Sequence, residues 1–220
     1  MAASTSRRRL LAVPVALLIL LALAAEVRAY GGKYGGAGGG YDRDDDDLKE
    51  RHRERVSKQA ETYVKALEAV RKEEELAHKR LQKGEQKARS DADGDDVKEK
   101  RAVRLARHKA IEMRLRADAK YARLFVAVQK FKAEEDDYFT GETKARIEIL
   151  VVQIKDQARS NRKRIADLYV DVEQPVKALK MLEAVYQSLS PNGRAMATDL
   201  RGQIKALRTQ LGLRDDDAGR

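Results

Sequence analysis

The chain has 220 residues and no cysteine, which excludes disulfides, thiol catalysis and thiolate metal sites. Charged residues make up 37% of the sequence and aromatic residues only 5%, a balance that is typical of long exposed helices and argues against a β-rich or doubly wound fold. The formal net charge of +10 makes the chain basic.

The first 29 residues have the pattern of a secretory signal. Three arginines at positions 7–9 precede the apolar run Leu10–Ala25, and Val27 and Ala29 stand where signal peptidase requires small residues. The run contains Pro14 and is shorter than the roughly 20 residues of a membrane-spanning helix. We predict cleavage after Ala29 and export to the periplasm or the extracellular space, by the Sec or the twin-arginine route. An uncleaved N-terminal membrane anchor is the alternative.

Residues 30–47 lack the side chains that a core needs. The stretch Gly31–Gly40 is mostly glycine, and Asp44–Asp47 is an acidic run. Ordering such a segment costs backbone entropy and buries no apolar surface. We therefore expect a flexible linker over residues 30–47, a helical body over residues 48–212 and a disordered tail over residues 213–220.

Apolar residues recur at alternating steps of four and three from residue 48 to about residue 89, which predicts a long amphipathic helix. Glu74 and Gly84 interrupt this apolar seam. On the opposite face, glutamates recur every seven residues from position 54 to position 75, each four residues before a lysine, which favours helical ion pairs. The aspartate- and glycine-rich segment 90–96 predicts a chain reversal, so a second long helix is expected to pack along the first.

Further helices are predicted at residues 97–135, 141–172, 175–189 and 194–211, with Thr140 as an N-cap and Pro175 in a first turn. Asn161 falls in the seam of the third helix. A polar seam residue either fixes helix register and oligomeric state or marks a locally hydrated contact, and homodimer formation is left open. The predicted fold is all-α: an elongated antiparallel bundle with a coiled-coil hairpin, followed by a short helical pair.

The chain resembles one tetratricopeptide (TPR) unit over about residues 162–191, from the end of the third long helix through the helix after it. Tyr169, Ala178, Leu182 and Pro191 stand close to the spacing of that family. The chain departs from the pattern where Arg162 replaces an aromatic residue, Ala166 a glycine and Val185 an alanine, and Pro191 comes one residue late. The resemblance implies the geometry of an antiparallel helix pair and a docking surface, because one unit cannot form the peptide groove of the family.

Two charged segments are candidate binding sites. Asp91, Asp93 and Asp95 alternate as in an EF-hand calcium loop, but Asp96 and Ala102 occupy positions at which that loop requires glycine and glutamate, so an acidic helix connector is the competing interpretation.

The second candidate is a basic stripe on the second helix, formed at helical spacing by Lys100, Arg104, Arg107 and Arg114. It would bind an anionic surface, a polyanionic polymer or an acidic protein. The competing interpretation is a solvated helix flank, or one paired with glutamates of a neighbouring helix. Export argues against nucleic acid as the partner.

Nucleophile motifs, phosphate-binding glycine loops and carboxylate pairs in an apolar setting are absent from the sequence, so we expect no catalysis and no cofactor. The leading hypothesis is a non-enzymatic, exported helical binding or scaffold protein that mediates protein–protein interaction, with an unidentified protein as its partner. The alternatives are a periplasmic holdase-type chaperone with basic helical arms, and an exported polyanion- or metal-binding protein.

Overall fold

The computed structural model describes residues 41–213, with side chains placed from residue 46 onward. The chain divides into two units, residues 1–45 and 46–220, and the helix packing below belongs to the second. The predicted signal peptide, the glycine-rich part of the predicted linker and nearly all of the predicted tail lie outside the described residues.

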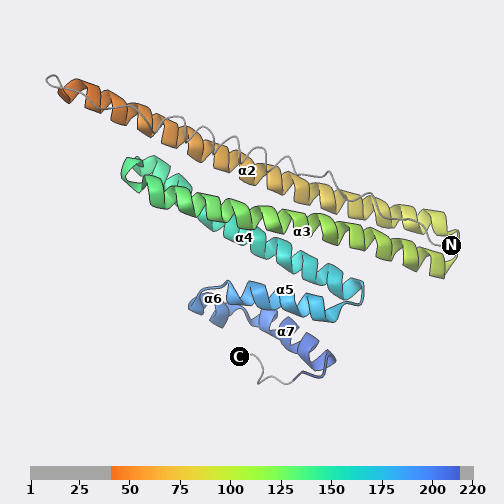
Figure 1. The fold of residues 1–220 in the computed structure, drawn as a ribbon. Helices are drawn as coiled ribbons and strands as arrows, with labels where there is room; N and C mark the ends of the chain where they lie inside the picture. Colours follow the sequence, from red (N-terminus) through yellow and green to blue (C-terminus); the bar gives the residue numbers. More distant parts are fainter. Residues whose placement is uncertain (1–40, 214–220) are drawn as a thin grey trace, which may run out of the picture. The chain divides into compact units, whose positions relative to one another are not determined.

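The described residues are helical apart from short turns, which confirms the all-α class (Figure 1). Three long helices, α2 (Tyr41–Ala92), α3 (Asp96–Glu135) and α4 (Gly141–Asp171), precede α5 (Pro175–Gln187), α6 (Pro191–Met196) and α7 (Thr198–Gln210). A short 3₁₀ turn, η1 (Asp136–Tyr138), joins α3 to α4. None of the helices within residues 41–213 has the length and apolar character that crossing a bilayer demands.

The N-cap and the first-turn proline predicted from the sequence are both present in the structure. The Thr140 hydroxyl accepts a hydrogen bond from the Thr143 amide (3.2 Å) at the start of α4, and Pro175 stands in the first turn of α5. Between α2 and α3, Asp93 and Gly94 adopt positive φ angles of 50° and 84°, and Asp95 then caps α3. The predicted chain reversal therefore takes only three residues.

Helix boundaries differ from expectation at both ends. Helix α2 begins at Tyr41, so it takes in the acidic run that we expected in the linker. The helix expected over residues 194–211 is two helices, because the Ser190 hydroxyl accepts from the Gly193 amide (3.1 Å) and starts α6 early. The chain then leaves helical geometry at Ala197 (φ −82°, ψ 55°) before α7 begins.

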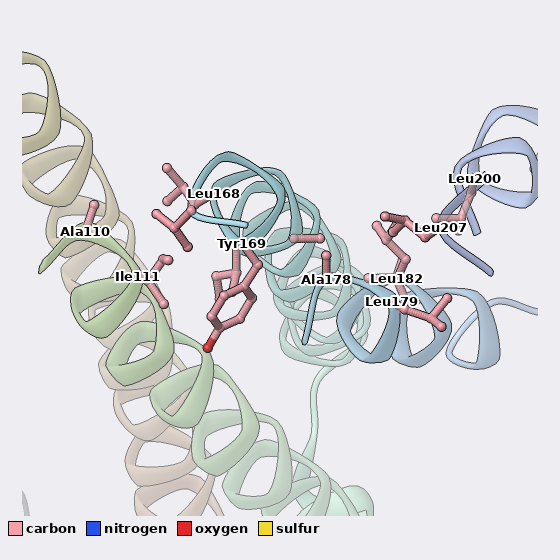
Figure 2. Packing of buried hydrophobic residues seen from close by; sticks show 13 residues of the cluster. Ala110, Ile111, Leu168, Tyr169, Ala178, Leu179, Leu182, Leu200 and Leu207 are labelled. Carbon is pink, nitrogen blue, oxygen red and sulfur yellow. The ribbon is translucent and has the colours of Figure 1, made fainter. Parts of the chain in front are cut away.

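Two apolar cores hold the helices together. The first, the α2–α4 core, joins residues of all three long helices, among them Leu67, Tyr121 and Ile154. The second, the α4–α7 core, extends from Ile111 of α3 through α4 and α5 to α7. Figure 2 shows Ile111 and Tyr169 between α3 and α4, and Leu182 of α5 facing Leu200 and Leu207 of α7.

A buried polar layer separates the two cores. It consists of Glu74 of α2, Arg114 of α3 and Asn161 of α4, which are 6%, 2% and 1% exposed. Arg114 Nη1 donates to Asn161 Oδ1 (3.1 Å), and Asn161 Nδ2 donates to the carbonyl oxygen of Arg114 (2.9 Å). Glu74 Oε1 lies 3.9 Å from Arg114 Nη1, and Glu74 Oε2 accepts from the Tyr121 hydroxyl (3.0 Å).

The polar layer explains both exceptions in the predicted seams. Glu74, which interrupts the seam of α2, meets Arg114, and Asn161 in the seam of α4 meets the same arginine. Buried polar groups cost free energy unless they are hydrogen-bonded, so sliding any one of the three helices would leave its partners unpaired. The contact at Asn161 thus has the geometry expected of a polar residue that fixes helix register. This is the first of the two interpretations that the sequence allowed.

We expect Arg114→Met to destabilise the protein by about 3–5 kcal/mol, because it removes one of the cations beside the buried Glu74 carboxyl and the side-chain hydrogen bond to Asn161. Urea denaturation measures this change in the free energy of unfolding. The control is Arg101→Met, an exposed position of the same helix, with an expected change below about 0.5 kcal/mol. Equal effects of the two substitutions would contradict the polar layer.

The stability of the protein is expected to depend on the protonation of Glu74. Burial raises the pKa of this carboxyl, although the Tyr121 hydrogen bond and the Arg114 charge lower the pKa in part. The folded protein therefore holds this proton more tightly than the unfolded chain does, and the associated stability is lost as pH rises through the raised pKa.

The free energy of unfolding of the wild type should thus fall relative to that of Glu74→Gln as pH is raised from about 4 towards neutral. Urea denaturation of both proteins at each pH gives the difference. Glu75→Gln, at the exposed neighbouring position, is the control and should show no such trend. A Glu74→Gln difference that is constant, or that changes in the opposite direction, would exclude the raised pKa.

Candidate functional site

The four residues of the predicted basic stripe lie in three different environments. Lys100 is exposed. Arg104 and Arg107 face the carboxyl end of α4, where Arg104 Nη2 donates to the Val172 carbonyl oxygen (3.0 Å) and Arg107 Nε lies 3.7 Å from Asp171 Oδ2. Arg107 Nε also donates to Glu85 Oε1 of α2 (2.9 Å). These two arginines therefore join helices, which is the pairing with a neighbour that the competing interpretation described.

Arg114 is not a surface residue, which corrects its assignment to the stripe. Its guanidinium lies in the polar layer, where Asn161 and Glu74 surround it. The stripe is regular along the sequence, but α4 covers α3 at position 114, and Arg114 is therefore inaccessible to a polyanion.

The three aspartates of the predicted calcium loop have separate positions in the turn between α2 and α3. Asp95 Oδ1 accepts from the amides of Val97 (3.0 Å) and Lys98 (3.1 Å), as an N-cap does. Asp91 belongs to the last turn of α2, and Asp93 stands at a positive φ angle. Across the described residues, no three histidine or acidic side chains gather closely enough to hold a metal ion.

A groove of about 630 Å³ lies between α2 and α3, and it is the candidate binding site. Its lining comes from residues 80–92 of α2 and residues 98–116 of α3. The floor is mostly small, with Gly84, Ala88 and Ala92 on α2 and Ala102 and Ala106 on α3. We call this region the α2/α3 groove.

The small residues of the floor let the two helices approach closely. A Cβ atom added at Gly84 would lie 2.9 Å from the Cβ of Ala106, so no larger side chain fits there without a shift. Leu81, Leu105 and Met113 add longer apolar side chains, and Leu105 is 55% exposed. Ala88 and Ala92 are buried in the structure, while the other apolar side chains that line the groove are partly or largely exposed.

Cations predominate on the rim of the α2/α3 groove. Arg80 and Lys87 of α2 and Lys98, Lys109 and Arg116 of α3 line it, against only Asp91 and Glu112. Arg80 Nη1 contacts the Met113 sulfur (3.7 Å). Within residues 46–213, none of the other four cations forms an ion pair.

The rim cations of α3 lie on a different flank of the helix from the predicted basic stripe. At 3.6 residues per turn, Lys109 lies roughly 140° around the helix from Arg104, so the two belong to different surfaces. The available signal was the alanine content of the two facing helices, which implies close approach and a shallow groove. Only the position of α4 shows which flank of α3 remains open.

The TPR-like residues lie in the α4–α5 pair. Tyr169, Ala178 and Leu182 are buried together in the α4–α7 core, and Pro191 begins α6. Comparison with known proteins finds no matching family model, no similar curated protein and no matching solved structure. The likeness therefore consists of these residues and one helix pair.

We expect Gly84→Ala and Gly202→Ala to have different effects on stability. Both glycines stand inside helices, where alanine is favoured by about 1 kcal/mol. A Cβ at Gly202 would contact nothing within 4 Å, whereas a Cβ at Gly84 would collide with Ala106. Thermal or urea unfolding should show Gly84→Ala to be less stable than Gly202→Ala by about 1–3 kcal/mol, the usual range for overpacking. Equal stabilisation by both substitutions would contradict the close approach of α2 and α3.

Proposed function

We propose that this protein is a non-enzymatic binding or scaffold protein, and that it holds a partner protein in the α2/α3 groove. The observation that carries the proposal is the combination of an apolar floor with rim cations that form no ion pairs in the described part of the chain. Contiguous exposed apolar surface rimmed by polar residues is typical of protein-binding sites.

The groove has the dimensions and chemistry for a helix of another protein. Antiparallel helices with alanine and glycine between them leave a shallow furrow, and helices pack 8–10 Å apart when small side chains meet. An amphipathic helix laid in such a furrow buries its apolar face against the floor. Leu81, Leu105 and Met113 provide the larger apolar contacts.

Contacts with the rest of the helical bundle support both helices of the groove. Leu81 packs against the α4–α7 core, while Arg104 and Arg107 tie the opposite flank of α3 to the end of α4. Preorganised surfaces lose less conformational entropy on binding, which favours affinity.

We propose further that the protein acts after export, in the periplasm or outside the cell. This part of the proposal is supported by the pattern of residues 1–29, in which a basic segment, an apolar run and small residues follow in the order of a signal peptide.

A photocrosslinking amino acid at Leu105 tests the function in the cell that makes the protein. The control position is Val170 of α4, which has similar exposure (48% against 55%) and does not line the groove. We expect one discrete adduct from Leu105, identified by mass spectrometry, and none of that mass from Val170.

Filling the floor with Ala102→Phe should abolish the adduct, whereas Ala119→Phe, at an exposed position of α3 outside the groove, should not. Adducts of equal yield at both crosslinking positions, or a broad mixture of unrelated clients, would refute the proposal. The broad mixture would instead favour a holdase.

A further inference from the structure

We infer that the occupant of the α2/α3 groove is an amphipathic helix with acidic residues at heptad spacing along both of its edges. The inference rests on the proposed function and adds the chemistry of the partner. It follows from the charge, the spacing and the length of the groove.

The cations of the rim are spaced as the edges of a coiled coil are. Arg80 and Lys87 on α2 are seven residues apart, and so are Lys109 and Arg116 on α3. Seven residues of helix correspond to about 10.5 Å, the repeat at which charged side chains flank a helical interface. A partner helix between α2 and α3 would therefore meet one heptad-spaced pair of cations on each edge, and Lys98, eleven residues before Lys109, adds a further cation near one end.

The sign of the charge selects an acidic partner. Five cations and two acidic residues line the groove, and the four cations without ion pairs lie on the rim, where their charge is available. Charge pairs at an interface rim favour association with the complementary partner and suppress binding of like-charged ones.

The length of the groove limits the partner to a short segment. The lining of α3 runs from Lys98 to Arg116, which corresponds to about 27 Å of helix. A partner helix of about three heptads would cover this length.

Other occupants fit less well. A polyanionic polymer would pair with the rim but leave the apolar floor and Leu105 uncovered, and a flat bilayer surface does not match a furrow. A second copy of the chain is equally basic, and the regular glutamates of its α2 are each followed four residues later by a lysine, so it presents no uniformly acidic edge.

Two synthetic peptides test the inference with the protein purified from the cell that makes it. Each has about three heptads, with alanine and leucine at the a and d positions. One carries glutamate at every e and g position, which also keeps the free peptide from self-association, and the matched control carries lysine there. Fluorescence anisotropy of the labelled peptides measures the dissociation constant at low and at moderate salt.

We expect the glutamate peptide to bind, with an affinity that falls as salt rises, and the lysine peptide not to bind. Lys87→Glu with Lys109→Glu should weaken binding of the glutamate peptide by about tenfold or more, since each reversal replaces an attraction by a repulsion. The matched variant, Lys79→Glu with Lys100→Glu, changes exposed lysines of the same two helices outside the groove and should leave the affinity within about twofold. Circular dichroism of both variants checks that they fold.

The inference fails if the two peptides bind equally, if neither binds, or if both double variants weaken binding alike. It also fails if polyphosphate or vesicles of phosphatidylglycerol bind through Lys87 and Lys109 while the glutamate peptide does not bind. A further contrary outcome is that the groove variants change only the self-association of the protein. The proposed function survives such a failure when Leu105 still crosslinks to one discrete protein. Loss of both the crosslink and peptide binding would refute the two together.

Discussion

The pairing of Arg114 with Asn161 and Glu74 is the contact on which the rest of the helical packing depends. Apolar seams with steps of four and three hold helices side by side, but a seam rich in alanine permits neighbouring registers at similar free energy. The buried guanidinium of Arg114 permits only the register in which Glu74 of α2 and Asn161 of α4 both lie beside it. One residue from each of three helices thus sets their axial positions, and the two apolar cores form on either side.

The groove is a consequence of that register. With Arg114 level with Glu74, the α2 residues near Gly84 come opposite the α3 residues near Ala106, and the helices approach until no Cβ atom fits at Gly84 without a shift of Ala106. Alanines on both helices then line a furrow instead of interlocking. A shift of α3 by one heptad would bring Met113 towards the position of Ala106 and fill the furrow, so the buried polar layer and the proposed binding surface are parts of one arrangement.

Helix starts that depend on residues adjacent in the chain were predictable from the sequence. Contacts between residues of different helices were not. Thr140 and Pro175 act through their own neighbours in the chain, and both stand where capping chemistry places them. Glu74 and Asn161 are recognisable as breaks in apolar seams, but their common partner lies on a third helix and only the packing identifies it. Arg114 was misplaced for the same reason, since spacing along one helix does not reveal which flank another helix covers.

The distribution of charge on α3 shows why net charge is a poor guide to what this protein binds. Arg104, Arg107 and Arg114 contact neighbouring segments through carbonyl oxygens, carboxylates and an amide, although the side chain of Arg104 remains 51% exposed. Lys98, Lys109 and Arg116 lie on the opposite flank beside the alanine floor. The proposed partner would therefore meet a short row of cations next to apolar surface, and a ligand with charge alone would leave the apolar part unused. Because burial of the floor requires an apolar face of matching shape, shape and charge together would select the proposed partner.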